Sequence, residues 1–232
     1  MKSLGFQRFL SELASTGGEA PTGETPAAEL PAVRRVDAAP ALEGSWALEM
    51  AGDQIVLAGA EGGPVACSLD TLARAKGWDR TALAGHDLKT ALVALRRAGL
   101  AATPRAAFDT LLAGYLLNPE SGNRLEDLAR ERLSRELPLP PSGKRGKTAE
   151  PEAPEAGVGR AAARAMAARD LVGPLRAALK EQGLEKLLTD IELPLLPILV
   201  EMELEGIALD KGVLAGISAE IGKRLLDLET RI

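Results

Sequence analysis

The sequence predicts an α/β domain that is followed by a helical region. Three short apolar runs, at residues 45–50, 53–59 and 63–69, are separated by Ala-Gly-Asp and Glu-Gly-Gly, which favour tight turns between strands. Beyond them, apolar residues recur at every third or fourth position, as they do on the buried face of a helix. Hydrophobic residues make up 46% of the chain and aromatic residues 3%, so we expect a core built mainly of Ala and Leu.

The three apolar runs predict an antiparallel meander of strands. Residues 69–77 then predict a helix that ends at Gly77, and residues 81–85 predict a buried strand that leads into a helix over 86–98. That helix has an apolar face formed by Leu88, Leu92 and Leu95, and Gly99 ends it. Three further helices are predicted, over 108–117, 124–134 and 159–181.

Two proline-rich segments divide the chain. Residues 14–43 and residues 138–157 combine several prolines with Ala, Glu and Gly and show no periodicity, which predicts a flexible linker and a disordered insertion. From residue 184 onwards the sequence predicts two helices that are broken at Gly206. The pattern of the last helix is still running at the end of the chain, so we expect a piece of a longer protein; its apolar seam is Val213, Ile217, Ile221, Leu225, Leu228 and Ile232.

Composition limits the class of protein. The 232 residues suffice for one sizeable domain, and the net charge of −5 gives no overall basic signature for nucleic acid. The single cysteine, Cys67, cannot form an internal disulfide, which favours a reducing compartment. No apolar run has the length of a signal or a membrane span. We therefore expect a soluble cytoplasmic protein, monomeric and without a membrane partner.

Three segments carry a resemblance to a known family. The segment FDTLLAGYLLNPESGNRLEDLARERL (108–133) resembles the helix pair after the second motif in the 3′–5′ exonuclease domain of family A DNA polymerases, the bacterial DNA polymerase I type. The segment LEKLLTDIELPLLPILVEMELEGIALD (184–210) is similar to the junction where that domain meets the polymerase domain. The segment LGFQRFLSEL (4–13) resembles the last residues of the 5′-nuclease domain that precedes it.

The resemblance implies a fold and a division of the chain. The fold would be the ribonuclease-H-like (DnaQ-type) α/β fold of 3′–5′ exonucleases, with a mixed sheet, followed by helices of the polymerase thumb. The expected parts are the end of a 5′-nuclease domain (1–13), a flexible linker (14–43), an exonuclease-like domain (44–183, with the insertion 138–157 disordered) and the start of the polymerase domain (184–232). The parent enzyme would extend primer-template DNA with Mg²⁺ in replication and repair. This fragment would lack the polymerase active site and hold no cofactor.

The first two exonuclease motifs are incomplete in this chain. The family carries Asp-x-Glu on its first strand, and the match is Ala47-Leu48-Glu49, which keeps only the Glu. An outward polar position on an edge strand is the alternative interpretation of Glu49. The second motif, Gly-x-Asn-x-x-x-Asp, matches Gly85 to Ala91, so Ala91 stands where the family has a metal-binding Asp. Asp87 takes the Asn position, and it is equally explained as an N-cap of the helix that follows.

The third motif, Tyr-x-x-x-Asp, matches Met166 to Asp170, which keeps the acid and loses the Tyr. Two-metal phosphodiester cleavage needs several carboxylates around ions that lie about 3.5–4 Å apart. The surviving remnants would be Glu49, Asp87 and Asp170, while Ala47, Ala91 and Met166 mark the losses. We therefore expect a catalytically inactive domain without a bound metal that serves as a scaffold.

Two alternatives of different classes stay open. One is an active, metal-dependent exonuclease with a rearranged site that uses Glu49, Asp87, Asp109 and Asp170, although Asp109 is also explained as the start of a helix. The other is a non-catalytic interaction module that binds a partner through the proline-rich segments and the terminal helix. His86, the only histidine, is expected to be a surface or first-turn residue. Four basic residues are candidate DNA contacts: Lys144, Arg145, Lys223 and Arg224.

Overall fold

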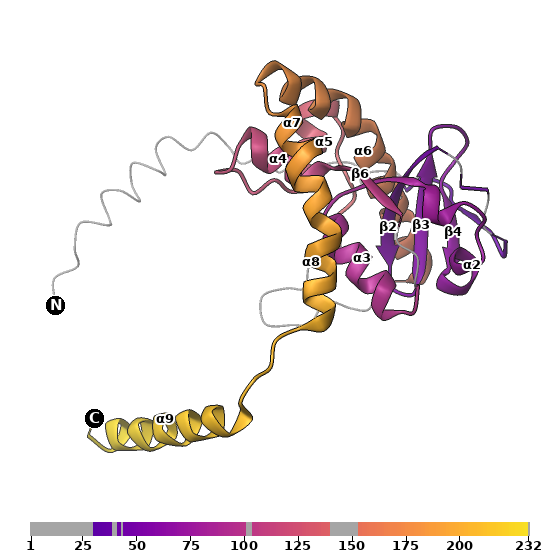
Figure 1. Ribbon diagram of the computed structural model, residues 1–232. Coiled ribbons are helices and arrows are strands. Elements are labelled where there is room, and N and C mark those ends of the chain that lie inside the picture. Colours follow the sequence, from indigo (N-terminus) through magenta and orange to yellow (C-terminus); the bar gives the residue numbers. More distant parts are fainter. Residues whose placement is uncertain (1–29, 39–40, 43, 101–103, 140–152, 232) are drawn as a thin grey trace, which may run out of the picture.

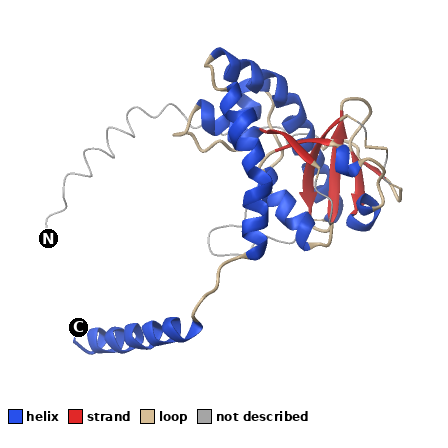
Figure 2. Ribbon diagram, viewed as in Figure 1, coloured by secondary structure: helices blue, strands red, loops and turns tan. Residues whose placement is uncertain are grey.

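The computed structural model describes residues 30–38, 41–42, 44–100, 104–139 and 153–231. Figure 1 shows a sheet with helices packed around it, and Figure 2 shows the same view with strands and helices distinguished. Within the described residues the sheet has six strands in the order β1-β4-β3-β2-β5-β6. The predicted α/β class with a mixed sheet is confirmed, because the sheet contains both antiparallel and parallel pairs.

The predicted meander forms the middle of the sheet. Strands β2 (Ser45–Ala51), β3 (Gln54–Gly59) and β4 (Val65–Ser68) pair antiparallel in sequence order. Gly52 has a φ of 63° in the turn between β2 and β3, a backbone conformation that glycine adopts without strain. Strand β5 (Ala82–Gly85) then runs parallel to β2, as expected for a buried strand that feeds a helix.

Two short strands complete the edges of the sheet. Strand β6 (Arg105–Asp109) pairs parallel with β5, so the helix predicted from residue 108 starts later, as α4 (Thr110–Leu117). Strand β1 (Arg34–Arg35) pairs parallel with β4 and lies inside the range that was predicted to be a linker. Both strands are held by pairing with a neighbour distant in sequence, which local periodicity does not reveal.

The helices follow the predicted order with shifted bounds. The predicted helix over 69–77 is shorter in the structure, and a 3₁₀ turn follows Gly77, which has a φ of 83°. The insertion predicted over 138–157 overlaps the start of the long helix α6 at Pro154. The helices besides α4 are α2 (Leu69–Ala73), η1 (Trp78–Arg80), α3 (Leu88–Arg97), α5 (Leu125–Leu133), α6 (Pro154–Glu181), α7 (Glu185–Leu187), the π-helix η2 (Leu188–Glu192), α8 (Leu193–Glu205) and α9 (Lys211–Arg231).

Helix α6 covers the face of the sheet from which Ala47, Glu49 and Val56 project. These residues share a face because Glu49 lies opposite Val56 in the antiparallel pair and side chains alternate along a strand. Val56 packs in one buried cluster with Ala161 and Ala162 of α6. The small side chains of α6 let the helix approach the sheet closely, which brings its polar residues to the end of β2.

Helix α8 is attached to the α/β domain through α3. The side chains of Leu88, Leu92 and Leu95 are buried, as the sequence predicted for one face of α3. Its other side forms ion pairs with α8, in which Arg96 Nη1 lies 2.7 Å from Glu201 Oε1 and Lys89 contacts Glu203. The region that the resemblance assigns to the start of the polymerase domain is therefore packed on the α/β domain through α8.

Helix α9 follows a break at Gly206, as predicted, and stands away from the rest of the molecule (Figure 1). None of its described residues is buried. The segment predicted as the end of a 5′-nuclease domain (1–13), most of the predicted linker and residues 140–152 of the predicted insertion lie outside the described residues. Across the described part of the chain, no helix combines the length and the apolar character that crossing a membrane requires.

Candidate functional site

Glu49 lies on a central strand, because β2 pairs with β3 on one side and with β5 on the other. The alternative interpretation, a polar position on an edge strand, is therefore wrong. Ala47 is on the same face, two residues earlier, and it is 1% exposed. The position where the family has its first Asp thus carries a buried methyl group, while the carboxylate of Glu49 extends from the same strand towards α6.

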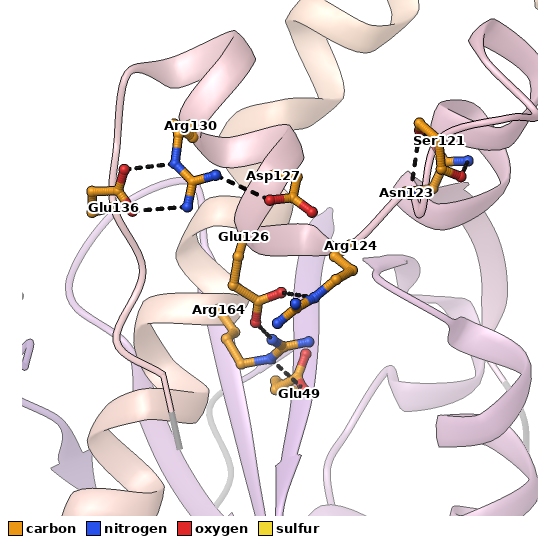
Figure 3. Close-up of polar contacts among 9 residues, drawn as sticks. All are labelled: Glu49, Ser121, Asn123, Arg124, Glu126, Asp127, Arg130, Glu136 and Arg164. Carbon is orange, nitrogen blue, oxygen red and sulfur yellow. Dashed lines mark hydrogen bonds and ion pairs between the residues drawn. The ribbon is translucent and has the colours of Figure 1, made fainter. Parts of the chain in front are cut away.

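The partner of Glu49 is an arginine on α6. The Nε atom of Arg164 donates a hydrogen bond to Oε1 of Glu49 over 3.0 Å, and its Nη1 donates to Oε1 of Glu126 on α5 (Figure 3). A second arginine, Arg124, places its Nε 3.6 Å from Oε2 of Glu126. The guanidinium of Arg164 therefore lies between two carboxylates that come from two different elements of the fold. We call Glu49, Glu126 and Arg164 the arginine-carboxylate cluster.

The arginine-carboxylate cluster is largely shielded from solvent. The side chains of Arg164, Glu49 and Glu126 are 23%, 18% and 12% exposed. Burial raises the pKa of Glu49, and the charge of Arg164 and its hydrogen bond oppose that rise. A buried carboxylate needs a positive partner or strong donors, and the guanidinium supplies both in a fixed planar geometry.

A cavity of about 290 Å³ lies beside the arginine-carboxylate cluster. Glu49, Asp87, Ala91 and Arg164 are among its lining residues. The structure therefore places matches of the first and second motifs around one space, although they lie about forty residues apart in sequence. Of these four side chains, Ala91 offers only a methyl group, so the second motif contributes no metal ligand at its expected position.

Asp87 serves as the N-cap of α3. Its side chain accepts a hydrogen bond from the backbone N–H of Thr90 over 3.3 Å, and its φ is 58°. The N-cap interpretation of this residue is therefore borne out by its contacts. The same carboxylate lies at the cavity wall, so it adds negative charge to the space that Arg164 faces.

His86 is held inside the fold by Thr110. Its Nδ1 lies 2.9 Å from Oγ1 of Thr110, whose hydroxyl donates to the carbonyl oxygen of Gly85 over 3.1 Å. Because the hydroxyl proton is used in that second bond, we assign the imidazole proton to Nδ1. Burial, together with the charge of Arg164, lowers the pKa of His86 to about 4. At neutral pH the ring is therefore neutral.

Asp109 is a structural acid, as the alternative interpretation of this residue predicted. It is 1% exposed, and its Oδ1 accepts from the N–H groups of Leu111 and Leu112 over 2.8 and 3.3 Å, which caps α4. The N–H groups of Leu88 and Asp87 also donate to it, over 2.7 and 3.3 Å. Burial raises its pKa, and these four backbone bonds oppose the rise. Its oxygens are therefore committed to two helix starts.

The structure does not bring Asp170 to Glu49. Asp170 binds Arg135 over 2.8 Å and Arg169 over 2.8 Å, and it follows Arg164 by six residues, about 9 Å along the axis of α6. Met166 is partly buried and packs against the main core. The α6 residue that contacts Glu49 on β2 is Arg164, which the sequence analysis did not identify. One signal could have found it, because Arg160 and Arg164 have the same four-residue spacing as the third motif.

The structure places two of the four candidate DNA contacts, both on α9, which contributes no residue to the cavity lining. Lys223 and Arg224 lie on α9, where Arg224 is paired with Glu220 over 2.7 Å, and Lys144 and Arg145 lie outside the described residues. On α5, Arg130 pairs with Asp127 and Glu136 over 3.1 and 2.7 Å (Figure 3), as expected for a solvated helix face.

The donor set does not fit a two-metal centre. In the part of the chain that the structure describes, no group of three or more His, Cys, Asp or Glu side chains is arranged to hold a metal ion. More directly, the guanidinium of Arg164 lies between Glu49 and Glu126 and donates a hydrogen bond to each of them. No catalytic step through metal ions can be derived from this arrangement.

Comparison with known proteins gives relatives of one kind. No family model matches the chain. The chain is 35% identical to DNA polymerase I of Bacillus subtilis over 153 residues, which cover 63% of the chain and 17% of that protein. It is 35% identical to DNA polymerase I of Chloroflexus aurantiacus over 156 residues, or 63% of the chain and 16% of that protein. A match to DNA polymerase I of Lactococcus lactis subsp. cremoris covers 99% of the chain at 29% identity and 27% of the relative.

Solved structures give two kinds of neighbour. The POL domain of Pol1 from M. smegmatis, in complex with DNA primer-template and dNTP, has a TM-score of 0.57 and 26% identity, over 78% of the chain and 32% of that structure. Brucella melitensis NrnC bound to pGG has a TM-score of 0.60 over 75% of the chain and 94% of NrnC, at 16% identity, so it is similar in fold alone. The chain spans less than a third of the matched polymerases. The resemblance to family A DNA polymerases is confirmed.

Proposed function

We propose that this chain, a relative of bacterial DNA polymerase I, is an exonuclease-like domain that has lost nuclease activity, joined to the first helices of a polymerase domain. Its role is to support a DNA-directed DNA polymerase of replication and repair. The parent enzyme acts on primer-template DNA in the cytoplasm as a monomer, and its Mg²⁺ is held by residues beyond this chain. The domain itself cleaves no phosphodiester bond.

The arginine-carboxylate cluster carries this proposal. An arginine that donates to Glu49 over 3.0 Å and also to Glu126 places a fixed positive charge where the exonuclease motifs of the family gather negative ligands. A divalent cation at the same place would meet the guanidinium at short range, and like charges repel strongly in a partly buried site. Ala47 and Ala91 remove two further ligand positions around it.

The ribonuclease-H-like fold belongs to the same proposal. It is supported by the mixed sheet, in which an antiparallel meander is extended by two parallel strands, and by the similarity in fold to NrnC. The scaffold role is supported by the ion pairs between α3 and α8. They attach the start of the polymerase domain to the exonuclease-like domain, so a stable domain without catalysis still positions α8.

The test is a nuclease assay with the whole chain. A single-stranded oligonucleotide labelled at its 5′ end is incubated with Mg²⁺ or Mn²⁺ and, in parallel, with chelator. An active proofreading exonuclease on the same substrate serves as the positive control. We expect the length distribution with metal to equal that with chelator, because Arg164 is already bonded to both Glu49 and Glu126.

A metal-dependent ladder of shorter products would contradict the proposal. Two variants then locate the activity. Loss of the ladder in Glu49→Gln would assign it to the cavity. Loss in the matched variant Asp170→Asn, at a position about 9 Å beyond Arg164 along α6, would assign it to the third-motif match.

A further inference from the structure

Helix α8 is apolar on two opposite faces. Its inner face is buried in the core through Leu193, Leu196 and Val200. Successive residues of a helix are about 100° apart, so the side chains half a turn away form a second stripe. This second stripe is exposed, and it begins with Ile191 in the preceding π-helix η2. We call it the α8 outer stripe: Ile191 56%, Leu195 38%, Ile198 56% and Met202 63% exposed. Helices that are apolar all round are typically covered on all sides.

Helix α9 carries a matching feature. It has a stripe of large apolar residues on one side, and no residue of the helix is buried. We call this the α9 stripe: Leu214 46%, Ile217 48%, Ile221 53%, Leu225 54% and Leu228 53% exposed. A continuous exposed apolar surface of this kind marks an interaction site.

We propose that α9 folds back and docks on the α8 outer stripe as an antiparallel helix pair. The numbering of the two stripes supports this arrangement, because their members lie at matching distances from the middle of the connecting segment. Met202 and Leu214 are each six residues from Ala208, and Leu195 and Ile221 are each thirteen. In an antiparallel pair, residues at equal distances from the turn face each other.

Two further pairs follow, one in the same register and one shifted by a single residue. Ile191 and Leu225 are each seventeen residues from Ala208, and Ile198 and Ile217 are ten and nine residues from it. The intervals of three and four within each stripe are those of a packed helix seam. Three of the four pairs therefore lie at equal distances from Ala208, as facing positions of a helix hairpin do.

The connection between the helices permits this hairpin. It consists of five residues, 206–210, and connections of two to eight residues are usual between packed antiparallel helices. A segment of that length spans up to about 16 Å, which exceeds the 8–10 Å between the axes of packed helices. Gly206 ends α8 with a φ of 71°, so the chain already turns at this point.

The occupant is α9 of the same chain rather than a second copy. A short connection holds α9 near α8 at an effective concentration in the millimolar range, well above that of a second chain in dilute solution. The ion pairs on the α3 side of α8 are compatible with docking, because Glu201 and Glu203 point to α3 while the outer stripe stays free of these contacts.

The test is site-directed cross-linking in the whole chain. The variant Leu195→Cys/Ile221→Cys places thiols at facing positions, and Leu195→Cys/Lys223→Cys is its matched control. Lys223 is only two residues further along, but two residues rotate it by about 200°, to the back of α9. A bismaleimide that reaches about 8–10 Å is used at low protein concentration, and the natural Cys67 is 2% exposed and therefore protected.

We expect the facing pair to form the intrachain cross-link about tenfold faster than the control, as judged by intact mass and gel mobility. Equal rates for the two variants, or cross-links only between chains, would overturn the proposal. A second facing pair, Met202→Cys/Leu214→Cys, repeats the test at another position in case the first pair disturbs the local structure. Circular dichroism checks that every variant is folded. Failure of both facing pairs in folded protein would also overturn the proposal. The outcome does not depend on nuclease activity, so it leaves the proposed function untouched.

Discussion

Two buried carboxylate sites lie on neighbouring parts of the same sheet. The acid of one accepts hydrogen bonds from the backbone, and the acids of the other accept them from a side chain. At the end of β6, Asp109 accepts four hydrogen bonds from backbone N–H groups. At β2, Glu49 shares one arginine side chain with Glu126. The first acid is bonded to the fold itself, whereas the second is bonded to one replaceable residue.

The difference separates an acid that is held by the backbone from two acids whose environment depends on one side chain. Backbone donors persist through most substitutions around them, so the environment of Asp109 is fixed by the fold. A guanidinium depends on a single residue, so the environment of Glu49 and Glu126 can be reversed at Arg164. On the proposed function, the arginine-carboxylate cluster is the place where one substitution excludes cations while the fold is kept.

The largest effect is expected for Asp109→Ala. The substitution leaves the N–H groups of two helix starts without their acceptor in a buried place, and we expect a loss of about 3–4 kcal/mol in the free energy of unfolding. Denaturation by urea, followed by circular dichroism, measures it. The control is Asp109→Asn, which keeps one oxygen and should lose about half as much. Equal stability of Asp109→Ala and the natural chain would show that these bonds contribute little.

A smaller effect is expected for Arg164→Met at pH 7. It leaves Glu49 and Glu126 partly buried and without their cation, and breaking a buried pair costs several kcal/mol, here reduced by residual solvent contact to about 2 kcal/mol. Since burial raises the pKa of Glu49, the loss should shrink as the pH falls towards 5 and the carboxyl becomes protonated.

The matched control for Arg164→Met removes both acids as well. Glu49→Gln and Glu126→Gln combined with Arg164→Met should recover most of the stability at pH 7, because no buried charge is left unpaired. A triple variant less stable than Arg164→Met alone would mean that packing, rather than charge, dominates at this place. Thermal melts at pH 5 and pH 7 make both comparisons.

The smallest effect is expected for the histidine next to the cluster. The pKa of His86 is about 4 in the folded chain and 6.5 when unfolded, so the unfolded state binds the proton first as the pH falls. The stabilisation is therefore full above pH 6.5 and is lost as the pH falls through 6.5 towards 4. Relative to His86→Gln, the natural chain should lose slightly less than about 2 kcal/mol between pH 7 and pH 5. Parallel pH profiles of the two proteins would contradict this sign.

Much of the fold could be predicted, because it follows from the local periodicity of apolar residues. The meander over 45–69, the face of α3 formed by Leu88 and Leu92, and the break at Gly206 all follow from spacing and turn residues. Strand β6 could not be found in this way, since its pairing with β5 is made across a helix. The same reason hides β1, which pairs with a strand about thirty residues later.

The sequence predicted where the candidate site lies but not all of the residues that form it. The first and second motifs led to Glu49, Asp87 and Ala91, which line one cavity. Arg164 was missed because an arginine is not a metal ligand and the motif matches rest on acids. The third-motif match, Asp170, lies six residues further along α6 and pairs with Arg135. A helix turns by about 100° per residue, so a shift of six residues changes the face as well as the height of a side chain.

The central claim is that the guanidinium of Arg164 takes the place of a bound cation. The most direct measurement is Mn²⁺ binding, followed by the loss of the free-ion electron paramagnetic resonance signal, for the natural chain and for Arg164→Asp. Arg176→Asp, on the same helix but outside the cluster, is the control. The account predicts binding only for Arg164→Asp, where a third carboxylate joins Glu49 and Glu126, and loss of that binding when Glu49→Gln is added. Equal Mn²⁺ binding by the natural chain, abolished by Glu49→Gln, would contradict it.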